Sequence, residues 1–471
     1  MQRPSLTEGS IMNALVRIAV PIIFSSVLQT MYQITDTYWV GQLSASAVAA
    51  VSLVFPINFL LIAIGGGLPI AGTVLIAQYK GRGDERMMNH VAAQTFLMVF
   101  VVSLVLSGLG FVFSESIIRA MGAGPDIVAD ATSFLRYTFL GFVFVFGFFV
   151  FESLMRGLGS VKAPVRIVLG TVVLNAILDP LFIFGWGPIP AWGVSGAALA
   201  TLCTQAMATV IGLLVLLGGK HGLHVKAADF APDWAFMKRA FFIGFPSSIE
   251  QSARAFGATI MTALVAGFGT VTLAAMGIGI RVLMFAIIPA MGLSIATSAL
   301  VGQNIGARKM DRALAINRIG SILAFVTLTL GGVVLWFVAY PLSELFMPDG
   351  GEALDRSAEF IRILAPTFGL VGWQMVLMGT MRGAGDTKSS MILTIVSQYL
   401  IQFPLAYIFA HVMQLGSVGI WWSFSVTNAI STVVIVLWYM RGSWKSKNLL
   451  GDAALREKVA EETIADEGMV S

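Results

Sequence analysis

The chain has 471 residues, of which 57% are apolar and only 11% are Asp, Glu, Lys or Arg. Charged residues make up about 25% of ordinary soluble domains, so this composition excludes a soluble globular protein. One helical crossing of a bilayer needs about 20 mostly apolar residues, and the chain has enough of them for on the order of a dozen crossings. The sequence therefore predicts a membrane protein.

Few residues are available for metal, disulfide or nucleotide chemistry. Cys203 is the one cysteine, which excludes intramolecular disulfides and a zinc site with paired cysteines. The four histidines have no HExxH spacing, and neither GxxxxGKS nor GxxxxGKT is present to bind phosphates. We expect no cofactor, no ATP and no enzymatic activity, because no pairing of nucleophile and base is evident either. The basic residues are spread over short loops, so the net charge of +4 does not indicate a nucleic-acid partner.

Twelve long apolar segments, closed by Gly, Pro or charged residues, are predicted to be transmembrane helices. A transmembrane β-barrel would alternate polar and apolar residues, whereas residues 140–151 carry no polar side chain on any face. The predicted fold is therefore all-α. The segments are 14–39, 46–72, 90–112, 133–155, 164–186, 192–218, 240–265, 271–298, 317–340, 358–381, 389–411 and 417–440.

Basic residues are concentrated in alternate loops between these segments. The loop after the second segment carries Lys80, Arg82 and Arg86, whereas the intervening loops hold only Arg119, Arg136, Arg356 and Arg362. The positive-inside rule then places both termini in the cytoplasm of a cell with this protein in its inner membrane. The first apolar segment is too long for the core of a signal peptide and is expected to be retained.

The sequence resembles itself at a spacing of about 225 residues. IAVP at 18–21 returns as IGFP at 243–246, AQYKGRGD at 77–84 as GQNIGARK at 302–309, RGLG at 156–159 as RGAG at 382–385, and DPLFIF at 179–184 as FPLAYI at 403–408. This pattern predicts an N-lobe at 1–217, a cytoplasmic linker at 218–239, a C-lobe at 240–441 and a charged cytoplasmic tail at 442–471. Six helices per lobe make the repeats parallel, related by a pseudo-two-fold axis along the membrane normal. Such repeats are typical of secondary transporters, although a channel or a flippase would also fit.

Four acidic residues fall within predicted spans: Asp36, Glu152, Asp179 and Glu250. A charge at mid-bilayer costs roughly 2.5 to 3.5 kcal/mol on insertion scales, so each needs a partner, a water-filled cavity or a proton. Glu250 precedes Arg254 by four residues and Glu152 precedes Arg156 by four, so both glutamates have an ion pair as an alternative to a functional role.

Asp36 and Asp179 have no basic residue one turn away, and each ends a polar stripe on one helix face. The stripes are Ser25, Gln29, Tyr32 and Asp36 on the first span, and Thr171, Asn175 and Asp179 on the fifth. Both helices run outward and both acids lie five or six residues before a glycine, which predicts a similar depth and a candidate cation site. The alternative is that each acid only hydrogen-bonds a neighbouring helix.

The two halves differ at these positions, because the repeat places Met261 or Thr262 opposite Asp36, Phe403 opposite Asp179 and Met378 opposite Glu152. A coupling site is therefore expected in the N-lobe. Pro21 lies within the first span, where the missing backbone donor permits either a hinge or a static kink.

The segment Gly383-Ala384-Gly385-Asp386 matches the GxGD motif of intramembrane aspartyl proteases. It lies in a basic cytoplasmic loop, and its repeat copy has Ser160 in place of Asp386. We interpret it as a helix-connecting turn that Asp386 ties together.

The chain resembles the multidrug and toxic compound extrusion (MATE) transporters from about Ile18 to Met440. The motifs that carry the resemblance are VLQTMYQITDTYWVGQL, LNAILDPLFIFG, GVSGAALAT and the two RGxG loops, the second extended to RGAGDTK. The resemblance implies twelve helices in two lobes around a V-shaped central cleft. In the DinF-like branch it implies an N-lobe cation site at Asp36, Asn175, Asp179 and Thr201, with Tyr32 lining the same chamber. The NorM-like branch uses an acid where this chain has Arg254, so a C-lobe cation site does not follow.

These observations predict an antiporter that exports organic cations or amphipathic drugs in exchange for H+ or Na+ by alternating access. Asp36 and Asp179 are the expected sodium ligands or proton carriers, Gln29 and Tyr32 the expected substrate chamber, and Pro21 the expected hinge. The expected partners are small molecules and the lipid bilayer. The alternative is a lipid-linked or polysaccharide flippase, for which several basic residues would be expected in the cleft, whereas only Arg254 and Arg281 lie deep in predicted spans.

Overall fold

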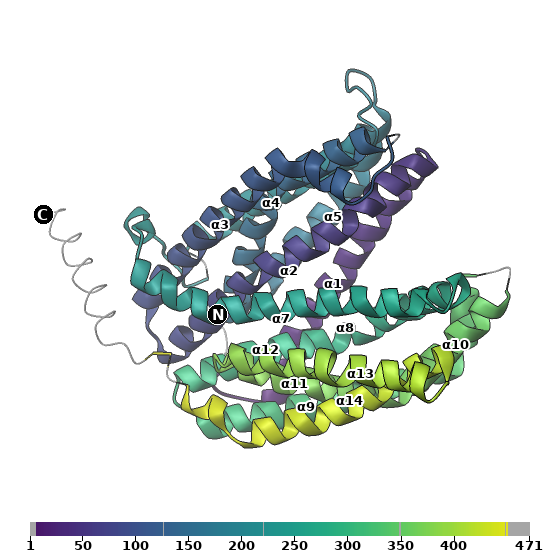
Figure 1. The fold of residues 1–471 in the computed structure, drawn as a ribbon. Coiled ribbons are helices and arrows are strands. Elements are labelled where there is room, and N and C mark those ends of the chain that lie inside the picture. Colours follow the sequence, from purple (N-terminus) through teal and green to yellow (C-terminus); the bar gives the residue numbers. More distant parts are fainter. Residues whose placement is uncertain (1–5, 126, 220, 348–349, 448, 451–471) are drawn as a thin grey trace, which may run out of the picture. The chain divides into compact units, whose positions relative to one another are not determined.

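The computed structural model describes residues 6–125, 127–219, 221–347, 350–447 and 449–450. Within these ranges the regular structure is helical, apart from an isolated antiparallel bridge between Trp186 and Ile189 (Figure 1). The prediction of an all-α fold is therefore confirmed. The last 21 residues of the predicted charged tail, from position 451, lie outside the described residues.

The first half of the chain forms six long helices and one short 3-10 turn. They are α1 (Ile11–Gly41), α2 (Ala45–Arg82), α3 (Glu85–Ala120), α4 (Val128–Gly157), α5 (Lys162–Phe184), α6 (Val194–Leu217) and η1 (Ala227–Phe230).

The second half also makes six crossings, but its last three are interrupted. The elements are α7 (Trp234–Ala266), α8 (Thr270–Gly306), α9 (Met310–Glu344), α10 (Glu352–Leu364), η2 (Ala365–Thr367), α11 (Phe368–Gly383), α12 (Thr387–Ile395), η3 (Val396–Gln402), α13 (Phe403–Tyr407), η4 (Ile408–Val412), α14 (Gly416–Met440) and η5 (Ser443–Ser446). The predicted tenth span consists of α10, η2 and α11, and the eleventh of α12 to η4.

Eleven helical segments in the described ranges are long and apolar enough to cross a membrane. The remaining predicted span, α7, is 33 residues long but carries Lys238, Arg239, Glu250 and Arg254. Charged side chains lower its apolar character, although its length of about 50 Å at 1.5 Å per residue exceeds a bilayer core. The protein is a multi-pass membrane protein.

Backbone conformation repeats at the same spacing as the sequence. The turn from α2 to α3 places Gly83 at φ 79, and the turn from α8 to α9 places Arg308 at φ 58, 225 residues later. The two RGxG turns likewise end in left-handed glycines, Gly159 at φ 73 and Gly385 at φ 89. Equal turns at equal intervals support the internal repeat.

The chain divides into two compact units whose boundaries lie inside helices. One unit contains the described residues up to Ile23 together with those from Ile249 to Leu449; the other contains Phe24–Ser248 and Leu450. Each boundary falls two residues after a proline within a helix, Pro21 in α1 and Pro246 in α7. The division into lobes at 1–217 and 240–441 stays a prediction from the repeat.

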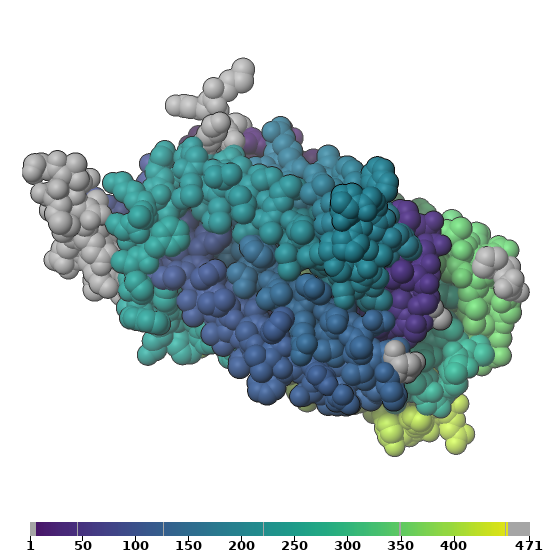
Figure 2. Space-filling view, turned by 90° about the horizontal axis from the view of Figure 1, so that it is seen from above, coloured from purple at the N-terminus to yellow at the C-terminus, as the bar shows by residue number. Residues whose placement is uncertain are grey.

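The Phe24–Ser248 unit is organised around α4, which packs against α2, α3 and α6. Phenylalanines fill these contacts, and Phe146 lies so close to Gly65 that a side chain at position 65 would overlap its ring. Thr73 of α2 donates a hydrogen bond of 3.0 Å to the carbonyl oxygen of Ser153. Figure 2 shows the side chains of this unit, coloured blue to teal, packed together over its face.

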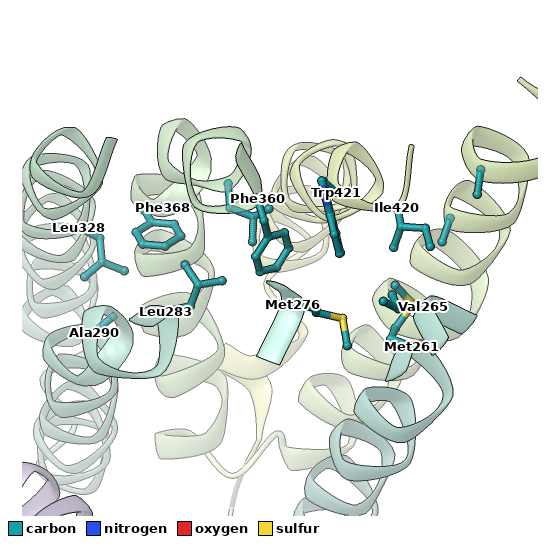
Figure 3. Packing of buried hydrophobic residues seen from close by; sticks show 13 residues of the cluster. Met261, Val265, Met276, Leu283, Ala290, Leu328, Phe360, Phe368, Ile420 and Trp421 are labelled. Carbon is teal, nitrogen blue, oxygen red and sulfur yellow. The ribbon is translucent and has the colours of Figure 1, made fainter. Parts of the chain in front are cut away.

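The other unit has an apolar cluster of 13 buried residues, ten of which Figure 3 labels. Its centre is the pair Phe360 and Trp421, whose ring centroids lie 4.6 Å apart. Met261 of α7 belongs to this cluster, and Phe403 of α13 packs against it. Because these two residues occupy the positions that correspond to Asp36 and Asp179, the second repeat has apolar packing where the first has its acid pair.

Candidate functional site

Asp36 and Asp179 occupy matching places near the outer ends of two helices. Asp36 precedes Gly41, the last residue of α1, by five residues, and Asp179 precedes Gly185, the C-cap of α5, by six. Neither helix has a basic residue in its last turn. At 1.5 Å per residue both acids lie about 8 or 9 Å from the helix ends, as the sequence predicts.

The two acids belong to one hydrogen-bonded group. The Asn175 amide donates a hydrogen bond of 2.9 Å to Oδ1 of Asp179. The carboxyl group of Asp36 lies within hydrogen-bonding reach of both Asp179 and Asn175. Asn175 and Asp179 are fully buried, with 0% exposure. The predicted facing of the two acids is therefore confirmed as geometry.

Helix α6 closes the group through two threonines. The hydroxyl of Thr204 lies 2.8 Å from that of Tyr32, which joins α6 to α1. Thr201 lies beside the same tyrosine, one turn earlier on α6. The sequence analysis singled out Thr201 but missed Thr204; its spacing of three residues, which places both on one helix face, is the signal that could have found it.

Not every residue of the two predicted stripes contributes. Thr171 is buried but donates its hydroxyl to the carbonyl oxygen of Val168 in its own helix, at 2.9 Å. Gln29 is exposed and Ser25 is buried. Pro21 lies within α1 outside the unit that contains the acids. The role of each predicted site residue stays a prediction; the structure establishes where each lies.

Four oxygen atoms of the group are buried without a hydrogen-bond partner among the described residues. They are Asp36 Oδ1, Asp179 Oδ2, Asn175 Oδ1 and Thr201 Oγ1. No ion pair joins either acid to a basic side chain in the described ranges. Carboxylate, amide and hydroxyl oxygens suit a hard cation or a shared proton, and an unpartnered buried oxygen costs about 1 to 3 kcal/mol. The group therefore has the chemistry of a site for H+ or Na+.

Transition-metal chemistry has less support. In the part of the chain that the structure describes, no group of three His, Cys, Asp or Glu side chains is placed to hold a metal ion. His90 instead lies 3.3 Å from Asp233, and Nδ1 of His221 lies 2.8 Å from the Ser160 hydroxyl.

Glu250 forms the predicted ion pair and a second one that the sequence analysis missed. Its Oε1 lies 2.9 Å from Nη2 of Arg254 and 3.2 Å from Nη1 of Arg382. Arg382 was assigned to a cytoplasmic loop, but it lies in the last turn of α11. Its residue type gave no signal, because the contact spans 132 residues of sequence.

Two other predicted contacts are confirmed. Glu152 pairs with Arg156 within α4 at 2.5 Å, the alternative that the spacing had left open. Asp386 is buried and accepts hydrogen bonds from Ser389 at 2.7 Å and Ser443 at 3.3 Å, so it ties together the turn between α11 and α12.

These features define a polytopic helical membrane protein with an internal repeat and a buried acid pair in one repeat. The sequence profile of the MatE family matches residues 21–181 and 246–408, two segments that begin 225 residues apart. They cover more than half of the chain, which therefore belongs to the MatE family, the MATE transporters.

Individual relatives are similar over nearly their whole length. The chain is 27% identical to the probable multidrug resistance protein YoeA of Bacillus subtilis, over 95% of this chain and 98% of that one. It is 25% identical to the FAD transporter of Shewanella oneidensis, over 91% and 94%. A crystal structure of MATE in the bent conformation superposes with a TM-score of 0.87 at 25% identity, over 97% and 98%. Assignment to the DinF-like branch stays a prediction.

Proposed function

We propose that the protein exports amphipathic small molecules in exchange for H+ or Na+. The observation that carries this proposal is the set of four buried, unpartnered oxygens around Asp36 and Asp179. A charge buried within a membrane span needs compensation, and these acids have no basic partner in the described residues. A proton or a sodium ion would supply that compensation.

Coupling follows from competition for one group of side chains. With both acids ionised and no cation bound, two negative charges face each other in the Phe24–Ser248 unit, which favours uptake of a cation from outside. The bound cation would release the substrate outward and permit return to the inward-facing state. Cytoplasmic substrate would then bind, and the exchange would be complete without ATP.

Alternating access needs a place where helices bend. Pro21 removes a backbone donor within α1, and a unit boundary follows it by two residues; Pro246 has the same relation to its own boundary in α7. We assign the hinge to these two positions. Both would let a helix change its angle without breaking the contacts within either unit.

The names of the relatives indicate the substrate class. YoeA is named a probable multidrug resistance protein, and the Shewanella relative a FAD transporter. Amphipathic small molecules with aromatic rings fit both names. The positive-inside rule adds the orientation, with both termini in the cytoplasm and the protein in the inner membrane.

Transport from proteoliposomes tests the proposal. Purified protein is reconstituted, and efflux of the cationic dye ethidium is followed under a sodium gradient at constant pH and under a pH gradient without sodium. We expect one gradient to drive efflux and ATP to have no effect. Efflux that responds to neither gradient would contradict ion coupling.

A further inference from the structure

A second polar cluster lies in the other unit, centred on one buried carboxylate and two arginines. Oε1 of Glu250 accepts hydrogen bonds from Nη2 of Arg254 at 2.9 Å and Nη1 of Arg382 at 3.2 Å. The Glu250 side chain is 1% exposed. Two guanidinium groups share one carboxylate, so the cluster has a net charge of +1.

One arginine of the cluster is open. The Arg254 side chain is 49% exposed although α7 continues for 12 residues beyond it to Ala266, about 18 Å of helix. A charged group at that depth faces water or a bound counter-ion, because exposure to hydrocarbon would be costly. Arg254 is therefore open to a solute within the span.

The open arginine also has unused donors. Within the described residues, all its hydrogen bonds start from Nη2, which reaches Glu250, Thr394 at 3.3 Å and the sulfur of Met378 at 3.9 Å. Nε and Nη1 have no partner there. A guanidinium presents its donors as a planar fork that matches a carboxylate or phosphate with two parallel hydrogen bonds.

The repeat relates this cluster to the polar stripe of the first half. At a spacing of 225 residues, Arg254 corresponds to Gln29 and Glu250 to Ser25. On the facing span, Tyr399 corresponds to Asn175, and its hydroxyl donates a hydrogen bond of 2.8 Å to the carbonyl oxygen of Ala253. The second repeat therefore keeps a polar position beside its eleventh span but gives it a positive charge.

A missing acid explains why the charge is in excess. In the first repeat, Arg156 has its own partner Glu152 four residues earlier. In the second repeat, Met378 stands where Glu152 would be, so Arg382 reaches across to Glu250 instead. Glu250 must then serve Arg254 as well, and a further anion is needed for neutrality.

We propose that Arg254, supported by Arg382, binds the carboxylate or phosphate group of an amphipathic solute within the membrane span. The proposal rests on the proposed transport function for its substrate, but it adds an anion site that is separate from the acid pair. It predicts that the protein accepts amphipathic anions or zwitterions in addition to cations.

Flavin mononucleotide and riboflavin form a matched pair of probes, because they differ by one phosphate group and both are fluorescent. Their binding to purified protein in an uncharged detergent can be measured by fluorescence anisotropy. We expect the mononucleotide to bind about 10-fold more tightly to the wild type, the usual size of a hydrogen-bonded charge pair. Arg254→Gln should abolish this preference.

Folding effects are separated by two further variants. The double change Glu250→Gln with Arg254→Gln leaves no stranded Glu250 charge and should also lose the preference. Arg156→Gln, which breaks the comparable pair with Glu152 in the other unit, should keep it. Equal binding of both flavins by the wild type, or an unchanged preference in both Arg254 variants, would overturn the proposal.

A lipid headgroup carries the same phosphate chemistry, so its competition is measured separately. Soluble short-chain phosphatidylglycerol should displace the mononucleotide no better than short-chain phosphatidylcholine does. Selective displacement by phosphatidylglycerol would assign the site to a lipid and overturn the solute assignment. Ethidium transport reports on the ion-coupled function independently: its loss with the flavin preference intact would refute coupling and leave the anion site.

Discussion

The hydroxyl groups of Tyr32 and Thr204 lie 2.8 Å apart and connect α1 to α6 beside the acid pair. Thr204 also donates to backbone oxygens of its own helix, to Ala200 at 3.1 Å and Thr201 at 2.9 Å. The tyrosine therefore holds the outer part of α1 in register with the helix that carries Thr201.

Removal of this hydroxyl should weaken cation coupling more than folding. Tyr32→Phe loses one hydrogen bond, worth about 1 kcal/mol, but keeps the ring packing. We expect a several-fold higher cation concentration for half-maximal transport and little change in the melting temperature. Thr35→Val is the control, because its hydroxyl bonds only its own helix, to Met31 at 3.0 Å. Equal effects of both variants would argue against a role for the Tyr32 contact.

Asp36→Asn should abolish ion-coupled efflux while the protein still folds and inserts. The amide is similar in size to the carboxyl group and can still hydrogen-bond, but it neither carries a proton nor attracts sodium. Dye efflux from energised cells is measured together with the amount of protein in the membrane. Wild-type efflux by a normally expressed Asp36→Asn protein would refute the site assignment.

Asp36 and Asp179 should titrate as one coupled pair. Two ionised carboxylates about 6 Å apart repel by roughly 3 kcal/mol at an effective dielectric near 20, so the two should share a proton until a cation binds. Carboxylate infrared titration of wild type should show two linked steps, and Asp179→Asn should leave one simple step. An unchanged titration of Asp36 in that variant would show that the acids are independent.

Glu250→Gln should lower thermal stability, because it strands two arginines at once. Breaking a buried ion pair typically costs about 3 to 5 kcal/mol. Because Arg382 also depends on Glu250, the additional change Arg254→Gln should recover only part of the loss, and removal of both arginine charges should recover more. Thermal unfolding in detergent measures each variant. A stable Glu250→Gln protein without transport would instead place Glu250 in the ion or substrate pathway.

Pro21→Ala should slow transport without destabilising the protein. Alanine restores the backbone donor that proline lacks and so straightens and stiffens α1. We expect a several-fold lower transport rate and an unchanged or higher melting temperature. Pro56→Ala, at a proline within α2 that lies away from the unit boundaries, is the control. Equal rates for Pro21→Ala and wild type would leave Pro21 as a static kink.

The sequence was most informative where local periodicity decides the outcome. The stripe ending at Asp36 and the stripe ending at Asp179 follow the helical period, and their distances from the terminal glycines sufficed to predict a common depth. The pairs Glu250–Arg254 and Glu152–Arg156 were equally accessible, since residues four apart are neighbours on a helix.

Contacts between distant segments were not accessible in the same way. The approach of Arg382 to Glu250 depends on how α11 packs against the helices around it, and no local pattern encodes that packing. The π-helical turns η3 and η4 were also missed, because an extra residue in a helical turn leaves little trace in an apolar sequence. The unit boundaries inside α1 and α7 could not be foreseen either, since both helices read as continuous apolar segments.

The left-handed backbone at Arg308 has a consequence for the history of the chain. An ordinary L-residue in that conformation costs about 1 to 2 kcal/mol, which the glycine at the matching position 83 avoids. The turn between α8 and α9 has thus retained its shape after losing the residue suited to it. If the halves descend from one duplicated ancestor, backbone geometry here has outlasted the amino acid, and Arg308 is a place where the second copy still bears the cost of that divergence.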